Sequence, residues 1–285
     1  MKTVVLLAML ASVAPVSAGQ LGLDPSNPIY LQDRGAGVST SMFGTYVRKG
    51  ELIVYPFYEY YRDDDLEYKP EEYGAAGDVD YRGRYRAHEG LVFVSYGLSD
   101  NIAVEFEVAA ISAAFKKSPM DTSTLPAEIN ESGLGDLEGQ IRWRWRTETA
   151  RRPEWFSYAE FVVPHAKDKA LIGTTGQELK FGLGLTRGLS WGTLTARAAV
   201  QYASSSSSPW DTGEYAVEYL KRLSPRWRVY AGIEGEQDEV SLITEAQWHI
   251  LPHGFVRFNN GLGLTSKATD WTPELGVLFT FPVSR

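Results

Sequence analysis

Apolar and polar side chains alternate along most of the chain after residue 50, and the alternation is clearest between Leu137 and Arg146. One parity of this stretch is apolar and the other is polar: Leu137, Gly139, Ile141, Trp143 and Trp145 against Glu138, Gln140, Arg142, Arg144 and Arg146. Successive residues of a β-strand point to opposite faces. The stretch therefore predicts a strand with one apolar and one charged face. Both a soluble antiparallel sheet and a membrane barrel use this pattern.

The same pattern recurs and predicts about twelve strands, near 51–62, 81–96, 101–112, 135–147, 155–165, 177–187, 191–203, 213–222, 226–236, 240–250, 254–264 and 272–282. Short connections alternate with longer ones rich in Asp, Ser, Pro and Gly, and only the turn at 237–239 breaks the order. Transmembrane barrels combine tight periplasmic turns with longer outward loops. We therefore predict an all-β fold, an antiparallel transmembrane β-barrel of about 12 strands within residues 51–285.

The beginning of the chain predicts export. Residues 1–18 have the features of a signal peptide: a positive Lys2, an apolar run, and the small-residue site Val16-Ser17-Ala18. Residues 19–50 are irregular and are expected to form a periplasmic lead-in or a plug in the barrel mouth. An even strand number leaves both termini on the periplasmic side, so the predicted location is the outer membrane of a Gram-negative cell.

Composition narrows the function. The chain has no cysteine and a net charge of −8, which argues against disulfides and against nucleic acid as a partner. Aromatic residues recur near strand ends, as expected of an interface girdle: Tyr81, Tyr85, Tyr96, Trp145, Trp155, Trp191, Trp227, Trp248 and Trp271. The expected partners are outer-membrane lipid, lipopolysaccharide (beside the acidic loop 63–80) and a small-molecule solute.

The parity opposite the apolar face is predicted to point into the barrel lumen, and it is heavily charged. The candidate lumen-lining residues are Arg82, Arg84, Arg86, His88, Glu105, Glu107, Glu138, Arg142, Arg144, Arg146, Glu178, Lys180, Arg197, Glu218, Arg228, Glu234, Glu245 and Arg257. The rows 82–88, 105–107 and 142–146 are expected to control passage. Two interpretations remain open: the charges brace a closed barrel, or they line a path that selects solutes by charge.

Signs of catalysis are weak. The four histidines lack metal-ligand spacing, and no nucleophile or nucleotide motif is present. The sequence thus predicts no catalytic residues, no metal site, no cofactor and no enzyme. A barrel enzyme acting on outer-leaflet lipid is an alternative that would need a nucleophile beside His165 or His249.

Several short motifs are shared with a known family. These are Gly133-Leu134-Gly135-Asp136-Leu137 before an alternating strand, Gly97-Leu98-Ser99-Asp100-Asn101, Arg228-Val229-Tyr230-Ala231-Gly232-Ile233-Glu234, and Gly261-Leu262-Gly263-Leu264-Thr265 with Asp270 and Gly276-Val277. Over roughly residues 45–282 the chain resembles the outer-membrane family labelled "MetA-pathway of phenol degradation". The resemblance implies an outer-membrane transporter and suggests aromatic solutes. The expected function is a channel or uptake protein for small solutes, hydrophobic or aromatic ones included; the main alternative is a closed structural barrel.

Overall fold

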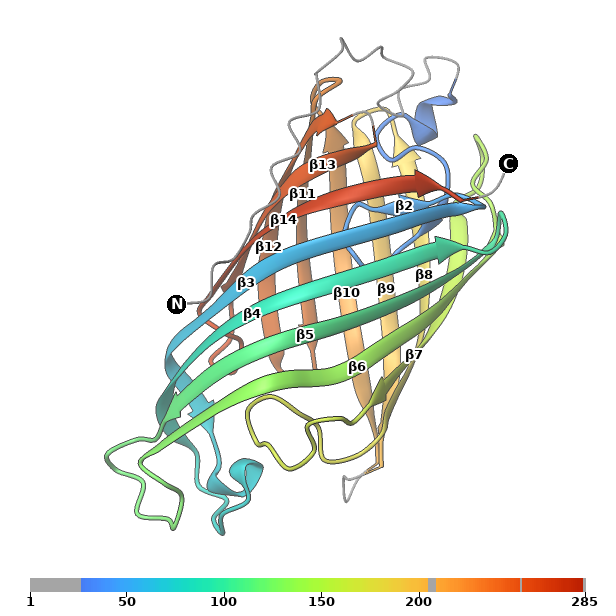
Figure 1. Cartoon of the computed structure of the whole chain (residues 1–285). Helices are drawn as coiled ribbons and strands as arrows, with labels where there is room; N and C mark the ends of the chain where they lie inside the picture. Colours follow the sequence, from blue (N-terminus) through green and yellow to red (C-terminus); the bar gives the residue numbers. More distant parts are fainter. Residues whose placement is uncertain (1–26, 205–208, 252, 284–285) are drawn as a thin grey trace.

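Twelve strands form a closed antiparallel barrel in the computed structural model, which describes residues 27–204, 209–251 and 253–283 (Figure 1). They are β3 (Glu51–Tyr68), β4 (Tyr81–Gly97), β5 (Ile102–Lys116), β6 (Glu128–Arg146), β7 (Glu154–Val163), β8 (Glu178–Leu189), β9 (Gly192–Ala203), β10 (Trp210–Arg222), β11 (Trp227–Glu236), β12 (Glu239–Leu251), β13 (Gly254–Gly263) and β14 (Trp271–Pro282). The predicted fold class and strand number are confirmed. The predicted signal peptide lies outside the described residues.

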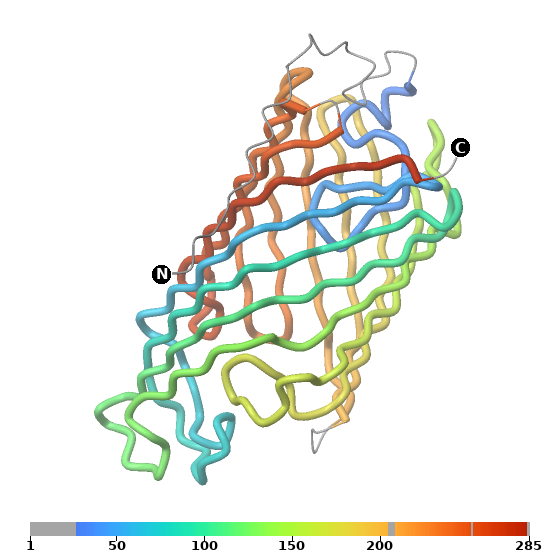
Figure 2. The backbone as a smooth tube through the Cα atoms, in the orientation of Figure 1, coloured from blue at the N-terminus to red at the C-terminus, as the bar shows by residue number. Residues whose placement is uncertain are grey.

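Each strand pairs with its neighbours in sequence, and β14 closes the barrel by pairing with β3. Closure matters because it leaves no sheet edge whose N–H and C=O groups lack partners. The connections differ between the two ends of the barrel. One end, here called the turn end, carries the short turns; the other, the loop end, carries most of the long connections (Figure 2).

The wall is not equally tall all round. β3, β4, β5 and β6 have 18, 17, 15 and 19 residues, whereas β7, β11 and β13 have 10 each. A membrane needs only about 9–11 residues per tilted strand. The four long strands therefore extend beyond the membrane at the loop end. They take up much of the predicted loops 63–80 and 113–134, because β3 continues to Tyr68 and β6 starts at Glu128.

Residues 27–50 do not join the barrel wall. They contain the 3-10 turn η2 (Ile29–Leu31) and the short strands β1 (Val38–Ser39) and β2 (Tyr46–Val47), which pair with each other. This N-terminal hairpin, blue in Figures 1 and 2, lies inside the barrel in its turn-end half. The other helical turn of the described residues is η3 (Pro70–Tyr73); none of the helices described could cross a membrane.

The outside of the barrel is apolar. Its exposed large side chains include Val92, Phe106, Leu137, Ile141, Phe181, Leu183, Val200, Val217, Ile233, Phe258 and Leu275. Such a continuous apolar surface suits lipid and would be an aggregation hazard in water. Tryptophans collect near the turn end, where Trp227 and Trp248 stack at 5.8 Å and Trp145 packs on Trp155. Tyr81 and Tyr85, expected on the outer face, instead pack inward around Tyr68 and Phe115.

The main apolar core lies between the hairpin and the wall. Val38 and Val47 of the hairpin pack on Ile53, Tyr55, Phe57, Leu91, Phe93, Ala103, Phe255 and Leu278 from the barrel. Because apolar side chains occupy this part of the lumen, the hairpin is seated by hydrophobic contact as well as by charge. Val38, Val47 and Ile53 are at most 1% exposed.

Inward-facing glycines make room for large aromatic rings on the neighbouring strand. A Cβ on Gly182 of β8 would lie 2.0 Å from Cζ of Tyr158. We expect Gly182→Val to displace this ring and to destabilise the barrel by about 1–3 kcal/mol, the usual cost of overpacking a filled interior. Gly90→Val is the matched control, because nothing lies within 4 Å of a Cβ at Gly90. Thermal unfolding in detergent, followed by circular dichroism, checks this; equal midpoints for both variants would contradict it.

Candidate functional site

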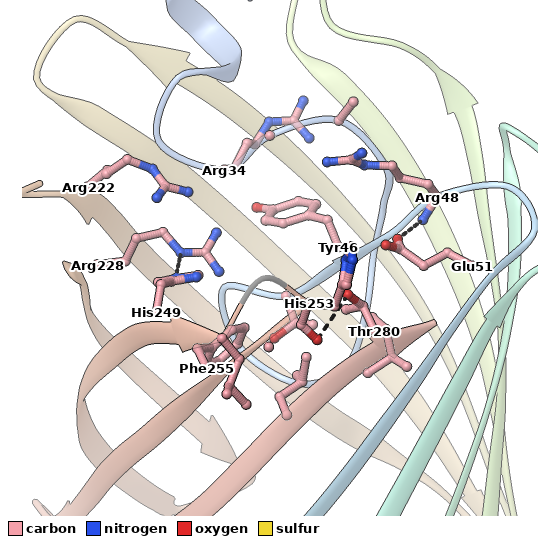
Figure 3. Close-up of a pocket in the computed structure, with 17 residues that line it drawn as sticks. Arg34, Tyr46, Arg48, Glu51, Arg222, Arg228, His249, His253, Phe255 and Thr280 are labelled. Carbon is pink, nitrogen blue, oxygen red and sulfur yellow. Dashed lines mark hydrogen bonds between the residues drawn. The ribbon is translucent and has the colours of Figure 1, made fainter. Parts of the chain in front are cut away.

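Two cavities of the described lumen lie on either side of the hairpin tip. The turn-end cavity has a volume of about 310 Å³ (Figure 3). It is lined by Arg34, Tyr46 and Arg48 of the N-terminal segment and by wall residues of β3 and of β10 to β14. The loop-end cavity has a volume of about 350 Å³ and reaches the connection between β13 and β14. Ser41, Met42 and Phe43, which form the tip, line the loop-end cavity. The hairpin therefore lies between two polar chambers of the same barrel.

The base of the hairpin is held by a buried ion-pair cluster. Nη2 of Arg34 lies 3.1 Å from Glu148 and 3.0 Å from Glu154, and all three side chains are 1% exposed. Arg144 and Arg187 also approach these carboxylates, at 3.4 and 3.3 Å. Burial by itself would lower the pKa of Arg34, but Glu154, Tyr46 and Glu148 outweigh it and the pKa is raised. Arg34 therefore stays charged and fixes the hairpin to the turn end.

The tip of the hairpin makes fewer contacts. Ser41 donates two hydrogen bonds to Oε2 of Glu105, from its amide at 2.9 Å and its hydroxyl at 2.6 Å. The ring of Phe43 stacks on Tyr230 with centroids 5.0 Å apart. The guanidinium of Arg197 lies over the Phe43 ring, with its Cζ 5.2 Å from the ring centroid. These contacts place the tip in the middle of the lumen.

Two arginines organise the charges around the tip. Arg197 lies 3.3 to 3.7 Å from three carboxylates, those of Glu214, Glu218 and Glu234. Arg257 lies 2.7 Å from Glu245 and 3.5 Å from Glu274. Both arginines are buried, so these carboxylates offset the cost of removing the guanidinium groups from water.

The charge of the lumen changes sign along the barrel axis. The loop-end cavity is lined by six glutamates, Glu59, Glu107, Glu214, Glu234, Glu239 and Glu274, against the two arginines Arg197 and Arg257. The turn-end cavity is lined by four arginines, Arg34, Arg48, Arg222 and Arg228, and by two histidines, against the single acid Glu51. A solute crossing the barrel would meet an acidic chamber and then a basic one.

Most of the candidate lumen residues alternate with the lipid-facing side chains and share the inward face. These are Glu105, Glu107, Glu138, Arg142, Arg144, Glu178, Lys180, Arg197, Glu218, Arg228, Glu234, Glu245 and Arg257. The structure brings Lys180 to Glu236 at 2.8 Å, and Arg142 to Gln140 at 2.6 Å. Arg146 is exposed at the turn end of β6, beyond a register shift, and is not brought to the lumen cluster.

The row Arg82, Arg84, Arg86 and His88 lies on the outer face, which corrects its inward assignment. In β4 the buried residues are Gly83, Ala87, Leu91 and Phe93, so the odd-numbered parity points inward. His88 accordingly meets the exposed Tyr58, with Tyr58 Oη 2.6 Å from His88 Nδ1. The physical reason is the height of the wall: this part of β4 extends beyond the membrane, so its outer face meets water and is polar.

Two kinds of lumen residue were not predicted from the sequence. The hairpin contributes Arg34, Ser41 and Phe43, which lie in a stretch without periodicity. The wall contributes Glu59, which lines the loop-end cavity, and its cross-strand neighbour Glu89 on the inward face of β4. In β4 the small residues Gly83 and Ala87 could have indicated which parity points inward, because small side chains suit the crowded inner face.

The surroundings of the histidines bear on the alternative of a barrel enzyme. Within residues 27–204, 209–251 and 253–283 no group of three or more acidic or histidine side chains is placed to hold a metal. His249 accepts a hydrogen bond from Arg228, with Nε of Arg228 3.1 Å from Nε2 of His249. The backbone amide of His165 donates to Asp136 at 2.7 Å. In this part of the chain neither histidine ring is hydrogen-bonded to a serine or threonine.

Comparison with known proteins identifies the fold. No protein-family model matches the chain, and no curated protein matches it in sequence. The COG4313 outer membrane channel from Pseudomonas putida F1 is 14% identical, with a TM-score of 0.62 over 86% of this chain and 100% of that one. The translocator domain of the autotransporter NalP from Neisseria meningitidis is 11% identical, with a TM-score of 0.52 over 82% of this chain and 89% of that one.

The shared fold is that of bacterial outer-membrane barrels. Together with the apolar exterior, this fold supports the outer membrane as the location. The orientation, with the turn end toward the periplasm and the loop end outward, stays a prediction. Membership of the phenol-degradation family stays a prediction, because no family model matches the chain.

Removing Arg34 should release the hairpin without melting the barrel. Arg34→Ala leaves two buried carboxylates short of a cation and should weaken seating by about 3 kcal/mol, because Arg144 and Arg187 still compensate in part. Chymotrypsin should then cleave after Phe43 or Tyr46, which pack inside the barrel while the hairpin is seated. Mass spectrometry detects the cleavage, and the circular dichroism melt should stay unchanged. Arg62→Ala is the control, because its pair with Asp64 is exposed and contributes little. Equal resistance of Arg34→Ala and the parent would refute this anchoring role.

Proposed function

We propose that this protein is a channel for small solutes across the outer membrane, with passage controlled by the N-terminal hairpin. The observation that carries the proposal is the arrangement of two polar cavities in series along the barrel, separated by the hairpin tip. A barrel that served only as a structural element would have no need for chambers of about 300 Å³ on both sides of an internal segment. The tip of the hairpin is thus the movable part of a plug whose base is fixed, and the strands β3 to β14 are the wall.

The hairpin is suited to move because it is held more weakly than the wall. β1 and β2 pair over only two residues each, whereas the barrel strands form a continuous closed ladder. At the tip, the hydrogen bonds from Ser41 and the stacking of Phe43 are the contacts that a displacement would break. Local opening is cheapest where few buried contacts are lost. The barrel can therefore stay intact while the tip moves aside.

The lining of the loop-end cavity suggests the class of solute. Its apolar surface comes from Met42, Phe43, Phe57, Tyr61 and Ile243, and its charge comes mainly from glutamates. This combination fits a small solute that has an apolar or aromatic body and a cationic group, which carboxylates attract and aromatic faces bind. The aromatic uptake implied by the family resemblance is compatible with this chamber.

Shortening the tip should open the path. We expect Phe43→Ala, alone or with Ser41→Ala, to increase single-channel conductance of the refolded protein in planar bilayers, because the tip loses its stacking and its bond to Glu105. Phe106→Ala, which removes a lipid-facing ring, is the matched control and should not change conductance. The acidic chamber should make the current cation-selective, and Glu107→Gln with Glu138→Gln should reduce that selectivity. A parent and tip variants that are all silent would instead support a sealed structural barrel.

A second proposal concerns the partner at the outer rim. The outward row of β4 joins basic residues of β3 and β5, so that Arg84 lies directly across from Lys116, and Arg62 across from Arg86. Asp64 bonds both Arg62 and Arg86, Asp65 and Glu67 pair with Arg82, and Glu128 lies across from Lys116. The five cations of the patch thus exceed its four acids by one. The patch lies on the wall beyond the membrane-spanning part, on the loop side. We infer that it binds the phosphate groups of lipopolysaccharide, the anionic lipid of that leaflet.

Lipopolysaccharide should stabilise the protein through this patch. Each cation near an anionic lipid surface contributes about 1 kcal/mol, so Arg84→Ala with Lys116→Ala should remove much of the rise in unfolding temperature that purified lipopolysaccharide produces in detergent. Arg146→Ala with Arg226→Ala, two exposed cations at the turn end, is the matched control. If the two double variants lose the stabilisation equally, the outward patch is not the binding surface.

A further inference from the structure

Two arginines of the turn-end cavity face each other without an acidic partner. Arg222 at the end of β10 and Arg228 near the start of β11 are direct cross-strand neighbours on the inward face. Like charges at such positions repel, because the side chains start only about 5 Å apart. Figure 3 shows both guanidinium groups directed into the cavity from the same side, with His249 below Arg228.

Neither arginine is neutralised by the described part of the chain. Nε and Nη1 of Arg222 are buried and have no hydrogen-bond partner there. Arg228 is 5% exposed, and its side-chain hydrogen bond in this part of the chain goes from Nε to the neutral acceptor Nε2 of His249. Asp33 is nearby, but its carboxylate accepts from the backbone amide of Arg222, at 2.8 Å, and from Lys221. A buried cation without a counter-charge is costly.

The other groups around the cavity do not supply the missing charge. Arg34 is already neutralised by Glu148 and Glu154. Glu51, the single acid of the lining, accepts a hydrogen bond from the backbone amide of Arg48 at 2.9 Å. Arg197 and Arg257, by contrast, are each paired with two or three carboxylates. Within the described residues neither Arg222 nor Arg228 makes such an ion pair, although they lie side by side.

We propose that the turn-end cavity is a binding site for a small oxyanion, a phosphate or a carboxylate, held between Arg222 and Arg228. A guanidinium group presents several N–H donors in a plane, which matches two oxygens of such an anion. Since Nε2 of His249 accepts from Arg228, the ring proton of His249 lies on Nδ1, and the ring orients the guanidinium of Arg228 toward the cavity. The volume of 310 Å³ equals roughly ten water molecules, enough for inorganic phosphate or benzoate.

This site does not depend on the proposed channel activity. A sealed barrel with the same cavity would still bind the anion, and a conducting barrel without anion affinity would still conduct. The test is accordingly a binding measurement on the folded protein and involves no flux. Its failure leaves the channel proposal standing, and the reverse also holds.

The experiment measures the stabilisation of the full mature protein in detergent by sodium phosphate, sodium benzoate and sodium chloride at equal ionic strength. We expect a saturable rise in unfolding temperature with phosphate or benzoate but not with chloride, because binding to the folded state stabilises it by mass action. Whichever oxyanion acts at the lower concentration identifies the ligand class. Isothermal titration calorimetry gives the dissociation constant.

Variants locate the site. Arg222→Gln and Arg228→Gln should each weaken anion binding about tenfold or more, and each should raise the unfolding temperature without anion, because one of two repelling buried charges is gone. Arg226→Gln, an exposed arginine beside the same turn, is the matched control and should bind like the parent. If a glutamine variant fails to fold, Arg222→Lys, which keeps the charge and loses the planar donor pair, replaces it. Stabilisation that is absent, or that is equal in the parent and in variants of Arg222 and Arg228, overturns the proposal.

Discussion

Closure of the barrel is the constraint on which the other features depend. The twelve strands satisfy one another's backbone hydrogen bonds, as a wall in lipid requires. The wall also needs an apolar outer face, so every second side chain within the membrane is apolar. The remaining parity is turned to the inside whether or not it is polar. In this chain it is strongly charged, so the interior has to solve an electrostatic problem that the wall creates.

The hairpin is part of the solution. Arg34 brings a cation to two buried acids of the turn end, and Ser41 donates two hydrogen bonds to the buried Glu105. Val38 and Val47 fill the apolar remainder. The same contacts define how the segment could act as a gate: its base is fixed by buried charge and apolar packing, whereas its tip depends on a few bonds that cost little to break.

The sequence was a good guide to the wall and a poor one to what lies inside it. Alternation found the twelve strands because the lipid-facing parity is apolar from Leu137 to Trp145 in β6 and throughout β14. It failed in β4, where Leu91 to Val94 are apolar on both parities and the charged row 82–88 lies above the membrane; the rule that charge points inward holds only within the bilayer. The hairpin contacts could not be predicted, because Arg34 and Glu148 are 114 positions apart and neither lies in a periodic stretch.

Within such a lumen, the unpaired charges carry more information than the paired ones. Arg197 and Arg257 are each surrounded by carboxylates, and their arrangement is explained by the needs of folding alone. Cross-strand pairs of like charge oppose folding instead. The acidic pairs include Glu107 with Glu138, Glu59 with Glu274 and Glu214 with Glu236, and the basic pair is Arg222 with Arg228. The basic pair lies at the turn end, away from the acidic pairs. A chain that keeps repelling pairs in its interior, where neutral side chains would be more stable, has them where a solute of the opposite charge can take the place of the missing partner.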